Sequence, residues 1–263
     1  MVHRSAAEGF DLRADTYASA RPSYHADLLD RCVSAGSRPS AFGDSAEAGE
    51  PGAPTEIVVD LGAGTGILTG QLIGRGLRPI AVEPVAAMRS ILLAEHPTAR
   101  VVGATAESTG VAGRSVDTIV AAQAFHWFDH PRALSEIARI LRPGGHLVCV
   151  WNVRDASVDW VRAYTEIMDR HAGDTPRYRT MEWRRAIEAD RRFALVDDWA
   201  VDHPVPSDSD RVIERALSTS FIAALHPEIQ EQVVAELRTL IEPLGPAFVF
   251  PYRSELTAWR LDD

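Results

Sequence analysis

A turn with three glycines at alternate positions follows an apolar segment of the chain. Gly62, Gly64 and Gly66 come directly after the residues IVVDL. A dinucleotide-binding fingerprint would place its third glycine one residue later, where this chain has Ile67. It would also disfavour the carboxylate of Asp60 beside phosphate groups. The turn therefore favours a cofactor that carries an ammonium group and no phosphate there, and a purely structural turn between strand and helix is the alternative.

Further carboxylates follow the next two apolar segments. Glu83 ends the segment PIAVE, where a carboxylate could accept both hydroxyls of a ribose lying across a sheet. Glu107 follows Ala106 after a third segment, where a polar edge could meet an adenine amino group. Glu83 could alternatively be a solvated residue at the end of a strand without a ligand. Glu107 could alternatively be an ordinary acidic residue of a loop.

Polar and aromatic side chains also follow the fourth and fifth apolar segments. His126 is the candidate catalytic residue, as a general base with an ordinary pKa of about 6.5. Packing or a substrate contact is the alternative role for this histidine. Trp127, Asn152 and Arg154 follow the same two segments and could line a pocket for an acceptor molecule.

The elements that must position these residues alternate between strand and helix. The spacing of apolar residues and the flanking Gly and Pro residues predict strands near 56–61, 79–84, 100–107, 115–124 and 146–152. Helices are predicted between these strands, and the clearest covers residues 131–142. Ligands of such sheets bind at the carboxyl ends of the strands. The pattern predicts a doubly wound, mostly parallel sheet with helices on both faces.

The rest of the chain divides into a lid, a loop and a cap. Residues 1–33 are expected to form N-terminal lid helices, and residues 34–55, rich in Ser, Ala, Gly and Pro, a flexible loop. Residues 56–152 are the expected cofactor-binding core. Residues 153–263 are expected to complete the same domain as a helical cap with closing strands, through helices at 157–172, 180–191 and 227–242 and strands at 193–205 and 254–261.

Composition excludes several classes of protein. The formal net charge is −10 and every basic residue is Arg, a balance that disfavours nucleic-acid binding. Two cysteines make no disulfide framework, and the nine histidines show no metal-ligand spacing. No run is long and apolar enough to span a membrane, and the first residues do not resemble a signal peptide. We expect a cytoplasmic protein, monomeric or homodimeric, with no membrane partner.

These motifs together resemble a known family. VVDLGAGTGILTGQL, AVEP, GATAE and VDTIVAAQAFHWFDHPRALSEIARILRPGG are similar to the successive motifs of class I S-adenosylmethionine-dependent methyltransferases of the small-molecule "type 11" kind. The segment FDLRADTYASARPSY resembles the motif that precedes the sheet and covers the cofactor in that group. The resemblance implies a Rossmann-like sheet of seven strands with an antiparallel last strand. It also implies S-adenosylmethionine as the cofactor.

The resemblance assigns roles to individual residues. It implies that Asp60, Gly62, Ala63 and Gly64 hold the methionine part of the cofactor and that Glu83 holds the ribose. Other residues would contact the adenine, the methionine part or the cofactor from the N-terminal segment: Ala106, Glu107, Gln123, Ala124, Tyr17 and Arg21. Arg21 and Arg154 would suit a carboxylate acceptor, as in the aconitate-methylating branch of the family.

Three functions stay open on the sequence. The favoured one is direct, in-line methyl transfer to a small-molecule acceptor. The alternatives are a non-catalytic protein that binds the same cofactor and an NAD-dependent oxidoreductase.

The lid is expected to be a helix that closes over the cofactor. One face of this helix would carry Tyr17, Arg21 and Tyr24.

Overall fold

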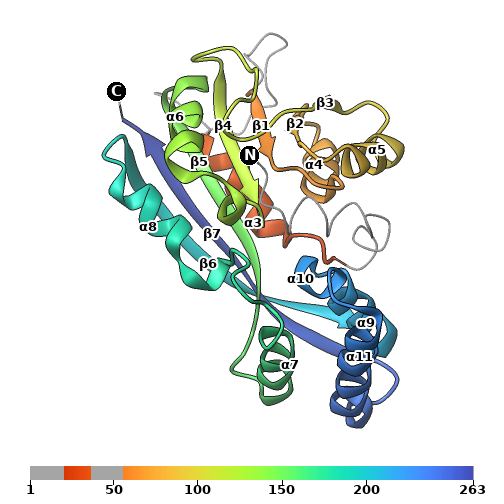
Figure 1. Ribbon diagram of the computed structural model, residues 1–263. Coiled ribbons are helices and arrows are strands. Elements are labelled where there is room, and N and C mark those ends of the chain that lie inside the picture. Colours follow the sequence, from red (N-terminus) through yellow and green to blue (C-terminus); the bar gives the residue numbers. More distant parts are fainter. Residues whose placement is uncertain (1–20, 37–55, 263) are drawn as a thin grey trace.

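The computed structural model describes residues 21–36 and 56–262. Its centre is one seven-stranded sheet in the order β3-β2-β1-β4-β5-β7-β6 (Figure 1). The first five strands run parallel, and β7 is antiparallel to both of its neighbours, β5 and β6. The predicted Rossmann-like sheet with an antiparallel last strand is confirmed. The strands are β1 Val58–Leu61, β2 Ile80–Val82, β3 Arg100–Val102, β4 Val116–Ala122, β5 Leu141–Arg154, β6 Phe193–Ser207 and β7 Phe248–Leu261.

Helices cover both faces of this sheet. Successive strand residues point to opposite faces, so Val58 packs with one helix layer and Val59 with the other. The first layer holds α3 (Ala26–Gly36) and α4 (Ile67–Ile73), through buried residues such as Leu28 and Leu72. The second layer holds α6 (His130–Ile140) and α8 (Glu182–Ala189). Helix α5 (Ala86–Glu95) lies between β2 and β3 in the chain.

A separate apolar cluster lies beyond the carboxyl ends of the short strands. Strands β5, β6 and β7 are 14 or 15 residues long, and they extend past the others to reach it (Figure 1). The cluster includes Tyr164, Leu237, Phe250 and Tyr252. The helices that build it are α7 (Asp159–Asp169), α9 (Ser209–Leu217), α10 (Ser220–Ala223) and α11 (Pro227–Ile241).

Several predicted boundaries need correction. The helix predicted at 131–142 ends at Ile140, because Leu141 takes an extended conformation and begins β5. The third strand covers only residues 100–102 of the expected 100–107. Helices α9 and α10 are additions to the predicted elements; they are short, at nine and four residues. Helix α3 continues to Gly36, past the expected start of the loop, and residues 37–55 lie outside the described residues.

The prediction that the lid helix includes residues 21–25 is wrong. Arg21 lies in a bend and the helix begins only at Ala26. The cause is local, because a residue before proline, here Pro22, is disfavoured from helical backbone angles. Tyr24 is buried, and its backbone N–H and C=O bond the side-chain amide of Gln71 at 2.9 and 3.0 Å. Tyr17 lies outside the described residues.

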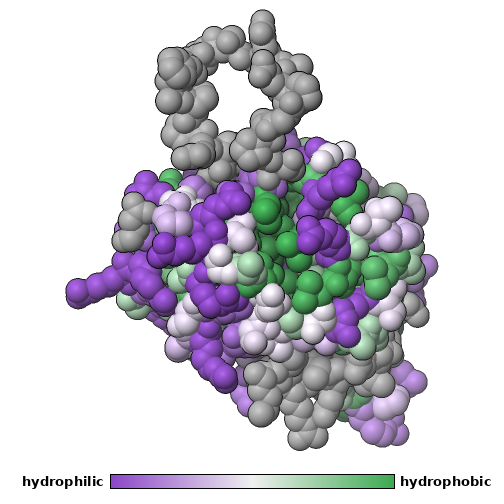
Figure 2. Space-filling view, turned by 90° about the horizontal axis from the view of Figure 1, so that it is seen from above, coloured by the Kyte–Doolittle hydropathy of each residue, from purple (hydrophilic) through white to green (hydrophobic). Residues whose placement is uncertain are grey.

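The surface mixes polar and apolar residues. Figure 2, a view from above, shows apolar residues gathered near the middle of that face with hydrophilic residues around them. Of the large apolar side chains among residues 21–32 and 56–262, four are exposed: Leu93, Leu195, Val196 and Val249. Over the same ranges, none of the helices has the length and apolarity that crossing a membrane requires.

Candidate functional site

The turn between β1 and α4 has its backbone amides already paired within the protein. The N–H groups of Gly62 and Ala63 donate to the carbonyl of Val82, at 2.8 and 3.1 Å, and that of Gly66 donates to Ala63. The N–H of Gly64 donates to Glu83 Oε2 at 2.9 Å. Four amides that could otherwise cradle a phosphate group are thus bonded to carbonyl or carboxylate oxygens.

Glycine is required at this turn for two reasons. Gly62, Gly64 and Gly66 all have positive φ, a region that residues with a Cβ rarely adopt. At Gly62 an added Cβ would lie 2.7 Å from the Cβ of Ala124, which follows β4. The turns after β1 and β4 are therefore in direct contact, and the predicted residues Gly62 and Ala124 meet there.

Asp60 lies beneath the turn. It is fully buried and accepts a hydrogen bond from Thr69 Oγ1 at 2.6 Å, while its Oδ1 has no partner among the described residues. Burial raises the pKa of Asp60 to about 7, and the nearby carboxylate of Glu83 adds to the rise, against the hydrogen bonds from Thr69. The structure thus places this predicted cofactor residue under the glycine turn.

Glu83 links the turns after β1 and β2. Its Oε2 accepts from Gly64 and its Oε1 from the N–H of Val85, at 2.8 Å. Burial raises its pKa although these bonds oppose the rise. Arg89 donates to the carbonyls of Glu83 and Pro84 at 2.9 and 2.7 Å, and so fixes the end of the strand.

The two residues predicted to flank adenine follow β3. Ala106 is buried and packs in the core. Glu107 accepts a hydrogen bond from the N–H of Asp129 at 3.0 Å. Its partial burial alone would raise its pKa, but the bonds from Asp129 and Thr105 together lower it. Glu107 is therefore an ionised group that also joins this loop to the start of α6.

A hydrogen-bonded chain connects the predicted residues after β4 and β5. Gln123 has a φ of 54°, which is uncommon for a residue other than glycine, and its Nε2 donates to the carbonyl of Asn152 at 3.1 Å. Asn152 Nδ2 donates to the carbonyl of Ser23 at 3.1 Å, and its Oδ1 accepts from Ser254 at 2.6 Å. Asn152 thereby holds the N-terminal segment against the sheet.

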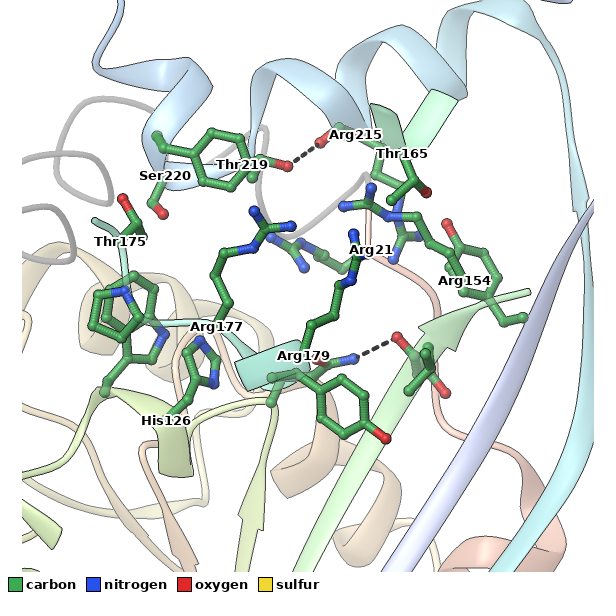
Figure 3. A pocket seen from close by; sticks show the side chains of 18 of the residues that line it. Arg21, His126, Arg154, Thr165, Thr175, Arg177, Arg179, Arg215, Thr219 and Ser220 are labelled. Carbon is green, nitrogen blue, oxygen red and sulfur yellow. Dashed lines mark hydrogen bonds between the residues drawn. The ribbon is translucent and has the colours of Figure 1, made fainter. Parts of the chain in front are cut away.

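A cavity of about 330 Å³ lies beside the hydrogen-bonded residues Gln123 and Asn152 (Figure 3). It brings together six residues that the sequence singled out: Arg21, Gln123, His126, Trp127, Asn152 and Arg154. The remaining lining residues come from β5 and the loop after it, from α7, from the segment before α8, from the stretch of α9 and α10, and from β7. Residues far apart in the sequence therefore share one cavity at the carboxyl edge of the sheet.

His126 lies on the 3-10 helix η1 (Phe125–Trp127) at one wall of this cavity. Its ring is 4.8 Å from that of Trp127 and 5.3 Å from that of Trp151, and its Nδ1 has no partner among the described residues. Burial lowers its pKa to about 3, assisted by the charges of Arg21 and His130. His126 is therefore neutral near pH 7, and it is a weaker base than an ordinary histidine.

The structure adds lining residues that the sequence reasoning missed. The main ones are Arg177, Arg179 and Arg215, with the hydroxyl side chains of Thr165 and Tyr252. Nothing in the local sequence marks them, because they lie outside the glycine, acid and aromatic motifs and reach the cavity only through the tertiary fold. In the described part of the chain, His, Cys, Asp and Glu residues form no cluster able to hold a metal ion.

Comparison with known proteins supplies independent evidence. A family model described as a methyltransferase domain matches residues 59–149. An uncharacterized methyltransferase of Mycobacterium tuberculosis is 40% identical over 170 residues, which are 65% of this chain and 62% of that protein. The matched stretch thus spans less than two thirds of the mycobacterial relative.

A second relative is covered more fully, and a solved structure shares the fold. An uncharacterized methyltransferase-like protein of Schizosaccharomyces pombe is 35% identical over 184 residues, 70% of this chain and 72% of that protein. The structure of a candidate type II methyltransferase from Anaeromyxobacter dehalogenans superposes with a TM-score of 0.64 at 24% identity. That match covers 92% of this chain and 97% of the other.

Proposed function

The chain belongs to the class I S-adenosylmethionine-dependent methyltransferase family, and we propose from this premise that it transfers a methyl group to a small-molecule acceptor. The observation that carries the proposal is the glycine turn. Its amides at Gly62, Ala63, Gly64 and Gly66 are already bonded within the protein, which disfavours a pyrophosphate there. The turn still allows a close approach of the backbone to a ligand without phosphate.

The residues around this turn fit the cofactor. Gly62 and Gly64 leave the turn without side chains, and Glu83 sets a carboxylate at the end of β2, the position expected to receive the ribose. When bound, S-adenosylmethionine supplies an electrophilic methyl group on a sulfonium. The remaining work of the chain is to orient an acceptor and to exclude water, which can contribute about 7–11 kcal/mol to a reaction of this type.

The cavity beside η1 is the proposed acceptor site. Trp127, Asn152 and Arg154 line it, as does His126. A side chain with a pKa of about 3 removes a proton poorly at pH 7. We therefore assign His126 a hydrogen bond to the acceptor, and its role as a general base stays a prediction.

Calorimetry tests the proposed cofactor. We expect the protein to bind S-adenosylmethionine or S-adenosylhomocysteine with a dissociation constant in the micromolar range and to show no heat of binding with NAD. Tight binding of NAD without binding of either methionine derivative would favour the oxidoreductase alternative and overturn the proposal. Transfer of an isotope-labelled methyl group to members of a metabolite panel separates an enzyme from a non-catalytic binding protein.

Glu83 provides a test within the cofactor site. Replacing it with Gln removes the charge and sets an amide N–H₂ against one of the two backbone N–H groups that it now accepts. Hydrogen bonds to charged groups contribute about 1.5–3 kcal/mol. We expect Glu83→Gln to weaken S-adenosylhomocysteine binding by about ten- to a hundredfold in calorimetry. Glu95→Gln, at an exposed helix end, is the control and should change nothing. Unchanged affinity in folded Glu83→Gln would leave Glu83 as a brace of the loop only.

The remaining predictions from the sequence concern the rest of the chain. We propose that residues 1–33 act as the lid, with Tyr17 and Arg21 facing the cofactor, and that the protein works as a monomer or homodimer in the cytoplasm. Arg21 lines the acceptor cavity, which supports a place for this segment near the site.

A further inference from the structure

The acceptor cavity is unusually rich in arginine. Five of its lining residues are arginines, and Asp and Glu are absent from the lining in the described part of the chain. They come from separate parts of the chain: Arg21 before α3, Arg154 at the end of β5, Arg177 and Arg179 before α8, and Arg215 on α9. Figure 3 shows several of these side chains turned toward the middle of the cavity. The cavity is therefore a positively charged site in a protein whose formal net charge is −10.

Two of these arginines share one acidic partner, and two others have none among the described residues. Arg177 and Arg179 both form ion pairs with Asp169. Within residues 21–36 and 56–262, neither Arg154 nor Arg215 has an acidic partner. Their guanidinium groups instead lie over aromatic rings, Arg154 at 5.0 Å from the ring centre of Tyr164 and Arg215 at 4.4 Å from that of Tyr252. Cation–π contacts offset only part of the cost of burying a charge.

The positive charges also act on one another. Burial lowers the pKa of Arg215, and the charges of Arg21 and Arg154 lower it further, while Tyr252 and Tyr164 raise it. The pKa of Tyr252 rises to about 12 through burial, although Arg215 opposes the rise, so its hydroxyl keeps its proton near neutral pH. Like charges at short range destabilise the protein unless an anion lies between them.

Buried hydroxyl groups complete the set of donors. Thr165 Oγ1 and Tyr252 Oη are buried and have no hydrogen-bond partner among the described residues, and both residues line the cavity. Tyr252 is 2% exposed. Leaving such a group unsatisfied costs about 1–3 kcal/mol. Planar guanidinium groups beside hydroxyl donors suit the oxygen atoms of a carboxylate or a phosphate.

We propose that the methyl acceptor is a small molecule with at least two negatively charged oxygen groups, bound by Arg154 and Arg215 with the hydroxyls of Thr165 and Tyr252. Arg177 and Arg21 line the same cavity, and η1 forms the wall with His126. This inference deepens the proposed function and rests on it. Carboxylates and phosphates share the required chemistry, so the test uses one probe of each kind.

The test is calorimetry on the full chain saturated with S-adenosylhomocysteine. The probes are citrate, pyrophosphate and the uncharged triethyl citrate. We expect citrate or pyrophosphate to bind and triethyl citrate not to bind, and the anion that binds more tightly identifies the group. Arg154→Gln and Arg215→Gln should each weaken the binding of that anion at least tenfold. Arg162→Gln is the control, because Arg162 is exposed on α7 and pairs with Asp159 at 2.7 Å.

Two outcomes would overturn the inference. One is a wild-type protein that binds S-adenosylhomocysteine but neither anion, or that binds triethyl citrate as well as citrate. The other is an unchanged anion affinity in both arginine variants. Tyr252→Phe keeps the ring and removes only the hydroxyl, so it serves if Arg215→Gln fails to fold, with a loss of about tenfold expected. Absence of S-adenosylhomocysteine binding by the wild type would instead contradict the proposed function itself.

Discussion

Gly62→Ala is expected to reduce S-adenosylhomocysteine affinity by more than a hundredfold and to lower the free energy of unfolding. The new Cβ would lie 2.7 Å from the Cβ of Ala124, an atom fixed to the backbone that cannot rotate away. The φ of +76° adds strain of about 1–2 kcal/mol for any residue with a Cβ. The turns after β1 and β4 would have to separate, and both belong to the proposed cofactor site.

Gly76→Ala is the matched control for this prediction. Gly76 has a φ of +82°, and an added Cβ there would meet nothing within 4 Å. It therefore carries the same backbone strain without the contact. Calorimetry and thermal unfolding of both variants separate the two effects. Equal losses in the two variants would mean that backbone strain alone, and not the approach of the two turns, explains the need for glycine.

Asp60→Asn is expected to change how stability depends on pH. The pKa of Asp60 is about 7 in the folded protein against 3.8 as the ordinary value, so folding favours its protonated form. Well below pH 3.8 the group is protonated in both states and costs nothing. As pH rises from about 4 to 7, the unfolded state ionises first and the wild type loses stability, by about 4 kcal/mol at most. Above pH 7 the loss is constant.

Asparagine cannot ionise, and its carbonyl oxygen can still accept the hydrogen bond from Thr69. The stability of Asp60→Asn relative to the wild type should therefore increase by several kcal/mol between pH 4 and pH 8, as measured by urea unfolding. Glu56, whose pKa burial also raises, is present in both proteins and cancels in this difference. Asp159→Asn, at a highly exposed side chain, should show no such trend. A difference that does not vary with pH would show that Asp60 is not a buried acid.

The sheet could be predicted from the sequence because its signals are local. Short apolar segments that end in Gly62, Glu83 or Gln123 mark both the strands and the edge where they finish, and a helix between them implies parallel pairing. The glycine turn and the acid after β2 lie on one continuous stretch of chain. Their proximity then follows from the topology alone.

The proposed acceptor cavity could be predicted only in part. Asn152 and Arg154 were found because they follow a clear strand. Arg215 lies on a helix whose buried residues are Val212, Ile213 and Ala216, and nothing in that pattern shows which neighbour its polar side faces. Helix α3 starts later than expected, at Ala26, because Pro22 disfavours helical backbone angles at Arg21, which the seven-residue spacing of Tyr17 and Tyr24 does not reveal.

The length of β5 and β7 has a consequence for how this chain could diversify. Both strands contribute buried residues to the core of the sheet and extend toward the second cluster, where Arg154 pairs directly opposite Tyr252. Substitutions and insertions within residues 155–247 can alter the acceptor cavity while leaving the turns after β1 and β2 untouched. A one-residue slip of β7 against β5 would instead turn Tyr252 to the other face of the sheet. If the cavity is the acceptor site as proposed, residues 155–247 can therefore change acceptor preference independently of the turns after β1 and β2, provided that the register of β5 and β7 is kept.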